Sequence, residues 1–147
     1  MSKRGFTLIE ILIVIGIIAL LAAGIIIALN PGRQFAKARD TQRVSHLNDI
    51  LKAILQNVVD NKGTFNCAAG DLPTTTPKNM SSNAGDYNIA PCLVPTYMPR
   101  MPVDPKDGSW TDVNNYDTKY QILQDPTTNR IILRATGELT TTIEVSQ

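Results

Sequence analysis

Apolar residues run from Ile11 to Leu29 without a single charge, and Glu10 is the charged residue that stands directly before them. At about 1.5 Å per residue, a helix over residues 6–29 would be roughly 36 Å long, whereas the hydrocarbon core of a membrane is about 30 Å thick. The pattern therefore predicts one membrane-spanning helix over residues 6–30.

The apolar run is interrupted at Pro31 and Gly32. Proline removes a backbone donor and clashes with the preceding helical turn, and glycine loosens the backbone further. We expect a hinge at these two residues, followed by renewed helix. The second helix should end near Gly63, because glycine commonly follows the last helical turn.

Apolar positions in the second helix, over residues 31–63, recur in steps of three and four, as on one face of an amphipathic helix. The stripe consists of Val44, Leu47, Leu51, Ile54 and Val58, with Ile50 and Leu55 beside it. This stem helix must bury one side against another part of the chain.

Residues 64–101 contain five prolines among Asn, Ser, Thr and Gly, and they predict an irregular connecting loop. Residues 102–147 carry alternating or β-branched segments at 119–123, 130–135 and 139–145, with a fourth candidate at 110–116. Short turns between them predict an antiparallel sheet of three to four strands. So small a sheet needs a helix over its apolar face, so we expect an α+β fold in which the stem covers the sheet.

A short basic leader precedes the anchor, and residues 5–10 are Gly-Phe-Thr-Leu-Ile-Glu. This pattern resembles the class III signal of type IV pilins and type II secretion pseudopilins, in which a membrane-embedded peptidase cuts after the glycine and methylates the new N-terminus. The resemblance implies removal of the leader peptide 1–5, cleavage between Gly5 and Phe6, and N-methylation of Phe6. Beyond residue 30 the chain resembles the family in layout rather than in motif.

The resemblance implies a type IV pilin-like fold and a structural role. The chain would be a subunit of a type IV pilus or of a type II secretion pseudopilus, polymerised into a helical homo-oligomeric filament through its N-terminal helix. Prepilin peptidase, an assembly platform and an ATPase are the implied partners. The subunit would be a single-pass protein of the cytoplasmic membrane with an extracytoplasmic head, and later part of a periplasmic or cell-surface filament.

Glu10 is the residue with the clearest implied assembly chemistry. A carboxylate inside the apolar zone costs about 2.5–3.5 kcal/mol on insertion scales unless it is paired. Cleavage would create an amine at Phe6, four residues away, and in the family the productive pair is understood to join two subunits. The competing interpretation is an acid that merely lies close to the headgroups.

Charge is unevenly distributed, although the 147 residues carry a net charge of only +1. Residues 1–63 carry eight Lys or Arg and four acids, whereas residues 64–147 carry six and nine. The small total argues against a general nucleic-acid binder, and we do not expect a nucleic-acid partner. Four basic residues beyond the anchor, here called the basic collar, are expected to contact anionic headgroups or acids of neighbouring subunits: Arg33, Lys37, Arg39 and Arg43.

Cys67 and Cys92 both lie beyond the anchor. In an exported domain such a pair indicates one disulfide, whereas in a cytosolic domain two free thiols would be expected. Basic residues flank both ends of the anchor, so the positive-inside rule does not decide the orientation. The resemblance and the cysteine pair place the head outside.

Other candidate chemistry is sparse. We expect no enzyme, because no nucleophile, base or phosphate loop occurs at a recognisable spacing. His46 is expected to be a packing or surface residue. We expect no cofactor and no metal; the alternative is a calcium site, because pseudopilins similar around Pro102-Val103-Asp104-Pro105 bind this ion. Its candidate ligands are Asp104, Asp107, Asp112 and Asp117.

Two other functions stay open on the sequence. The chain could be a membrane-anchored binding module that does not polymerise. It could also be a minor pilin at a filament tip that contacts a surface or DNA.

Overall fold

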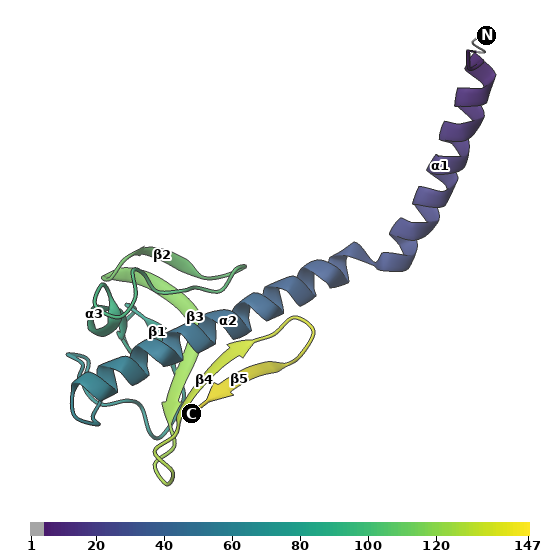
Figure 1. The fold of residues 1–147 in the computed structure, drawn as a ribbon. Helices are drawn as coiled ribbons and strands as arrows, with labels where there is room; N and C mark the ends of the chain where they lie inside the picture. The colour runs from purple at the N-terminus through teal and green to yellow at the C-terminus, as the bar shows by residue number, and fades with distance from the viewer. Residues whose placement is uncertain (1–4) are drawn as a thin grey trace. The chain divides into compact units, whose positions relative to one another are not determined.

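The computed structural model describes residues 5–147, and Figure 1 shows its helices and strands. In chain order the elements are α1 (Leu8–Leu29), α2 (Pro31–Asp60), β1 (Lys78–Ser81), α3 (Ala90–Leu93), β2 (Ser109–Asp112), β3 (Asn115–Gln124), β4 (Ile131–Thr136) and β5 (Thr142–Ser146). They form two compact units, the first ending at Ala36 and the second, here called the head, running from Lys37 to Gln147.

The boundary between α1 and α2 lies at one residue, Asn30. Its backbone has φ 42° and ψ 76°, which is left-handed geometry that ends a helix. Its side-chain Oδ1 and its carbonyl oxygen then accept hydrogen bonds from the N–H of Arg33, at 3.3 and 3.0 Å, at the start of the next helix. Pro31 is the first residue of α2, where its fixed φ fits and its missing N–H costs nothing. The predicted interruption therefore consists of an asparagine that ends α1 followed by a proline that starts α2.

One face of α2 forms the helical side of the head core. The fully or almost fully buried positions are Leu47, Ile50, Leu51, Ala53 and Ile54. Leu55 and Val58 are partly buried against this core. Val44, which the sequence pattern assigned to the stripe, is 40% exposed, and this assignment was wrong. Arg43 takes the buried place one helical turn before Leu47 instead.

The sheet of the head is antiparallel, with the order β1-β3-β4-β5 and with β2 also paired to β3. In Figure 1 α2 runs across this sheet. Between helix and sheet lies one core that includes Tyr120, Ile122 and Leu133, all completely buried. The predicted α+β class, with a long N-terminal helical region packed on a small antiparallel sheet, is confirmed.

The sheet has five strands, rather than the three to four that the sequence predicted. The additional strand, β1, lies inside the segment expected to be an irregular loop, as does the short helix α3. β1 has only four residues, Lys-Asn-Met-Ser, and no alternating apolar pattern; it is a strand because it pairs with β3 and buries Met80. The predicted strand over 110–116 is divided by a tight turn, where Asp112 Oδ1 accepts the N–H of Asn114 at 2.7 Å.

Candidate assembly site and the contacts that support the head

Thr7 and Glu10 form a reciprocal cap at the start of α1. The N–H of Glu10 donates to Thr7 Oγ1 at 3.3 Å, and the N–H of Thr7 donates to Glu10 Oε2 at 3.3 Å. This is a capping box, which satisfies two of the backbone donors that a helix start leaves free. A carboxylate in the first turn also interacts favourably with the helix dipole. Glu10 therefore has a local structural role besides any assembly role.

The predicted cleavage site, between Gly5 and Phe6, precedes the helix. Phe6 is 82% exposed, and a Cβ on Gly5 would meet no atom within 4 Å. Because α1 begins at Leu8, Phe6 and Glu10 do not share a helical face in the uncut chain. Residues 1–4 of the predicted leader lie outside the described residues.

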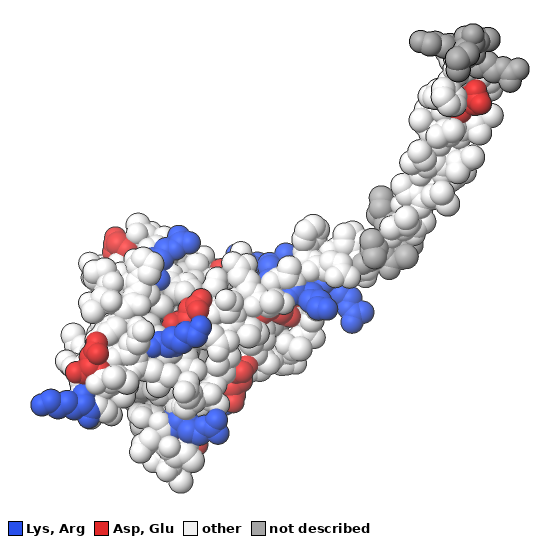
Figure 2. Space-filling view, in the orientation of Figure 1, with Lys and Arg blue, Asp and Glu red and all other residues white. Residues whose placement is uncertain are grey.

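Within α1, residues 8–25 are long and apolar enough to cross a membrane, by length and composition. None of the side chains described there is buried by the chain itself. Figure 2 shows the described part of this helix as white atoms apart from one acidic side chain near its N-terminal end. This surface is apolar without a cover, which is typical of a segment that contacts lipid or other helices.

Within the head, a charge network joins residues 39–43 of α2 to Asp104 and to the turn between β4 and β5. Arg43 Nε and Nη2 donate to Asp104 Oδ2 and Oδ1, at 2.6 and 3.2 Å. Its Nη1 donates to Asp40 Oδ1 at 2.8 Å and to Glu138 Oε1 at 2.9 Å. Arg39 donates to both carboxylate oxygens of Glu138, at 2.7 and 2.6 Å. Such two-pronged pairs combine strength with a fixed geometry.

Asp40 extends the network to the backbone of the turn between β4 and β5. Its two carboxylate oxygens accept the N–H groups of Glu138 and Leu139, each at 2.9 Å. One helical turn thereby holds segments that lie 61 to 99 residues away in sequence. Arg43 is thus buried and paired inside the head, so its assignment to the basic collar was wrong. Arg39 is paired with Glu138, although its side chain stays 35% exposed.

Arg33 and Lys37 form no ion pair with any residue that the structure describes. Only these two members of the predicted collar keep their charges available for headgroups or neighbours.

Electrostatics keep this network ionised. Hydrogen bonds from Arg39 and Arg43 lower the pKa of Glu138 to about 2. Burial raises the pKa of Asp104, but Arg43 and two backbone N–H groups outweigh burial, so the pKa lies below its usual value. The pKa of Asp40 is lowered in the same way, against burial, by two N–H groups of the turn and by Arg43. The carboxylates, Asp104 first among them, in turn raise the pKa of Arg43.

Three of the four aspartates named as calcium ligands have separate partners. Asp104 pairs with Arg43, while Asp112 caps its own turn. Asp117 accepts from Lys119 Nζ at 2.7 Å and from Asn79 Nδ2 at 2.9 Å. Among residues 5–147 no group of three or more His, Cys, Asp or Glu side chains lies close enough to hold a metal ion. The structure thus does not bring these four carboxylates together.

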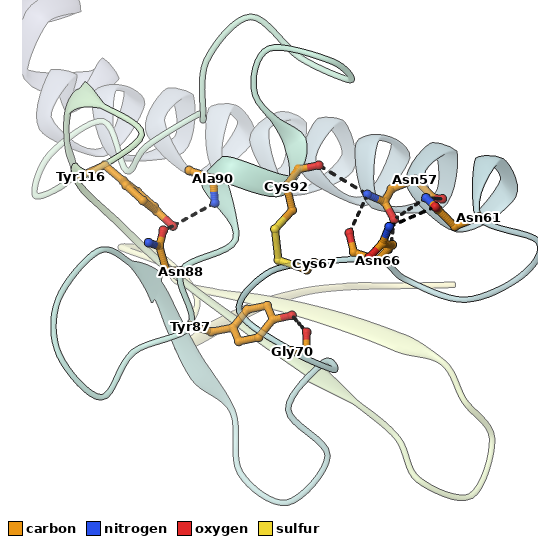
Figure 3. Close-up of a disulfide and its surroundings, with 10 residues drawn as sticks. All are labelled: Asn57, Asn61, Asn66, Cys67, Gly70, Tyr87, Asn88, Ala90, Cys92 and Tyr116. Carbon is orange, nitrogen blue, oxygen red and sulfur yellow. Dashed lines mark hydrogen bonds between the residues drawn. A yellow bond between two sulfur atoms is a disulfide. The ribbon is translucent and has the colours of Figure 1, made fainter.

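Cys67 and Cys92 form a disulfide, with their Cα atoms 5.2 Å apart. Figure 3 shows this bond beside α2, next to a group of asparagines. Tyr87 Oη donates to the carbonyl of Gly70 at 2.7 Å, which joins the two segments that carry the cysteines. The predicted disulfide is confirmed.

His46 is the single histidine, and it packs at the edge of the core. Its Nδ1 lies 3.0 Å from the hydroxyl oxygen of Tyr120, and the two rings meet edge-on with centroids 6.1 Å apart. Burial lowers the pKa of the imidazole, which favours its neutral form.

The network around Arg43 is the main feature that sequence reasoning missed. One signal was available, because Arg43 lies four residues before Leu47 and so falls on the stripe that the core buries. Its partners could not be identified, because Asp104 and Glu138 are distant in sequence and surrounded by ordinary turn residues.

Comparison with known proteins agrees with the N-terminal motif. The family model described as the prokaryotic N-terminal methylation motif matches residues 1–26. The type IV wide pilus major component PilA4 of Thermus thermophilus is 48% identical over 69 residues, which are 46% of this chain and 51% of the relative. The chain thus matches about half the length of this curated relative. No solved structure matches the chain. The resemblance of this chain to the type IV pilin and pseudopilin family, expected from its first residues, is therefore confirmed.

Proposed function

We propose that this chain is a structural subunit of a type IV pilus or of a type II secretion pseudopilus-like filament. The observation that carries the proposal is α1, an apolar helix of 22 residues with one acid, whose described side chains the chain itself leaves unburied. In a membrane lipid covers this surface, and in a filament the same helices of other copies would cover it. The methylation motif and the similarity to PilA4 support this assignment.

Assembly would depend on Glu10 and on the amine of Phe6. In the described residues the carboxylate of Glu10 has only Thr7 as a partner, so no cation compensates its charge. A carboxylate in the apolar zone costs about 2.5–3.5 kcal/mol on insertion scales. Cleavage after Gly5 would give Phe6 a charged amine, and the amine of an incoming copy could pair with Glu10 of a copy already in place. Relief of this cost would favour docking in one register.

Partners and location follow from the same proposal. Prepilin peptidase would remove residues 1–5, and an assembly platform with its ATPase would extract the subunit from the membrane. The head would lie outside the cytoplasm, a placement that the Cys67–Cys92 disulfide supports. We infer a structural rather than a catalytic role, without a cofactor.

Processing is the first test. The full chain, expressed in membranes with a prepilin peptidase, should lose residues 1–5 and gain one N-methyl group, as measured by mass spectrometry. A bulky substitution, Gly5→Leu, should abolish both changes without preventing insertion. A wild-type chain that stays uncut would contradict the proposal and favour a plain membrane-anchored module.

Glu10 is the second test, with filament yield in sheared surface material as the measurement. Glu10→Gln keeps the size of the side chain but removes its charge, so insertion and processing should continue. Because pairing then contributes nothing, the yield should fall by about tenfold or more. Glu144→Gln, a matched change on the exposed sheet face, should leave the yield unchanged. Normal filaments from Glu10→Gln would refute the pairing mechanism.

A further inference from the structure

Asn57 connects α2 to both segments that carry the cysteines (Figure 3). Its Nδ2 donates to the carbonyl of Asn66 at 3.1 Å and to the carbonyl of Cys92 at 3.4 Å. Its Oδ1 accepts the N–H of Asn66 at 2.9 Å. One side-chain amide thus contacts the backbone of the residue next to Cys67 and the backbone of Cys92 itself.

The Asn57 side chain is also held by a hydrogen bond from its own helix, α2. The residue is only 3% exposed, although it lies on a helix otherwise rich in surface positions. Asn61, one turn later, donates to the backbone carbonyl of Asn57 at 2.8 Å and to its Oδ1 at 3.4 Å. The Oδ1 of Asn61 in turn accepts from Asn66 Nδ2 at 3.2 Å. The Asn57 amide is therefore held in one orientation, with its hydrogen-bonding atoms directed at the loop backbone.

These contacts hold two parts of the chain that are distant in sequence against the same turn of α2. Cys67 and Cys92 are 25 residues apart in sequence, and bringing such ends together costs conformational entropy. The side-chain amide of Asn57 hydrogen-bonds to the backbone of both segments, at Asn66 and at Cys92. A buried amide that lost these partners would be left unpaired, at a cost that favours the docked arrangement.

We propose that Asn57 is the positioning residue for formation of the Cys67–Cys92 disulfide, so that the bond forms on a head whose loop is already docked on α2. With a small-molecule disulfide as the oxidant, one cysteine thiolate attacks a sulfur of the oxidant and releases one small thiol. The second cysteine thiolate then attacks the protein sulfur of this mixed disulfide and releases the second small thiol. Two protein thiols have lost two protons and two electrons, which the oxidant has taken up.

Asn57 acts on the second step, which is intramolecular. When Asn66 and Cys92 are held by their backbones on α2, the effective concentration of one cysteine at the other is raised. The disulfide would then form mainly in molecules whose Asn66 and Cys92 segments are already docked on α2. This role goes beyond the proposed filament function and does not depend on it.

The test uses the full chain in detergent micelles, equilibrated with mixtures of reduced and oxidised glutathione, trapped by alkylation and measured by mass spectrometry. Asn57→Leu should lower the effective concentration of the cysteine pair by about tenfold or more, since its three hydrogen bonds to the loop backbone are lost. Asn57→Asp should also lower the effective concentration. The carboxylate can still accept the N–H of Asn66, but it has no donor for the carbonyl oxygens of Asn66 and Cys92 and repels them.

Thr118→Val is the matched control. It removes a buried hydroxyl that donates to the carbonyl of Met80 at 2.7 Å, away from the disulfide. Thr118→Val should lower the effective concentration of the cysteine pair much less than Asn57→Leu does. The comparison is made per degree of thermal midpoint that each variant loses. Equal effects of the two variants would mean that Asn57 only stabilises the fold, and would overturn the proposal.

A second measurement holds even if an Asn57 variant folds poorly. In the double variant Cys67→Ser, Cys92→Ser, the backbone amide of Asn66 should remain protected from hydrogen exchange, because Asn57 still accepts its hydrogen bond. Exchange of this amide at the rate of an exposed loop would show that the disulfide orders the loop, and would also overturn the proposal.

Discussion

Arg43 is a charged side chain at a core position of α2, with only 3% of the side chain exposed. Removing an ion from water costs several kcal/mol, and pairing repays this cost only when the geometry is good. Here Nε, Nη1 and Nη2 each have a carboxylate partner at 3.2 Å or less. At the scale of the single residue, the guanidinium of Arg43 therefore neutralises three carboxylates, those of Asp40, Asp104 and Glu138.

Replacement of this residue should be costly. Arg43→Met keeps the unbranched stem of the side chain but removes the guanidinium, and it leaves Asp104, which is 6% exposed, without its cation. We expect a loss of about 3–5 kcal/mol in the free energy of unfolding, measured by urea denaturation of the full chain in detergent. Lys52→Met is the control, because the Lys52–Asp49 pair is exposed and should contribute less than about 1 kcal/mol. A similar small effect for both variants would show that the Arg43 network does not stabilise the head.

At the scale of the element, the turn between β4 and β5 is hydrogen-bonded directly to α2. A Cβ on Gly137 would collide with the carbonyl oxygen of Thr140 and would lie 2.7 Å from its Oγ1. The next two residues, Glu138 and Leu139, donate their N–H groups to Asp40. Glycine is therefore needed in this turn for the close approach of its backbone.

Gly137→Ala should shift the turn and weaken its attachment to the helix. We expect a loss of about 1–3 kcal/mol in the free energy of unfolding, together with faster hydrogen exchange at the N–H of Leu139. Gly32→Ala should lower neither the free energy of unfolding nor the protection of Leu139, since its added Cβ meets no atom closer than 3.7 Å and alanine favours helix. If Leu139 exchanges at the wild-type rate in Gly137→Ala, the turn tolerates the methyl group and the prediction fails.

At the scale of the whole molecule, lowered carboxylate pKa values make the head sensitive to acid. Glu138 has a pKa of about 2 in the folded chain, below its ordinary value of about 4.3. A depressed folded-state pKa contributes stability that is present above the unfolded value and is lost as the pH falls through the folded value. The thermal midpoint of the head should therefore decrease between pH about 4 and about 2. Glu138→Gln should make this decrease shallower, and an unaltered profile would contradict the assignment.

Buried tyrosines predict a second limit, at alkaline pH. Burial raises the pKa of Tyr87 and of Tyr116 to about 12 in each case. A raised folded-state pKa contributes stability that is present below the unfolded value, about 10, and is lost as the pH rises. The thermal midpoint should therefore fall between pH about 10 and about 12, with phenolate absorbance appearing at unfolding. Tyr87→Phe should reduce the alkaline loss, and wild-type behaviour of this variant would show that Tyr87 is not responsible.

Much of the helical part could be predicted from the sequence, because its signals are local. The helix break near Pro31 and the apolar stripe through Leu47, Leu51 and Ile54 were predictable because they depend on residues close together in sequence, although the break lies at Asn30 and Gly32 is inside α2. The disulfide was predictable as well, because the two cysteines could pair only with each other within the chain. The strand β1 was not predictable, because its four residues become a strand only through their partner β3.

The sequence by itself determined the anchor, its acid and the helix-on-sheet class, since a charge-free run and a repeating apolar pattern act within a few turns of one element. Only the tertiary structure decided where the charges of the stem are used. Arg43 and Asp104 are 61 residues apart and meet because the core between α2 and the sheet brings them together. Asn57 gains its role beside Cys92 in the same way. Such contacts depend on how distant segments pack, and no local pattern specifies them.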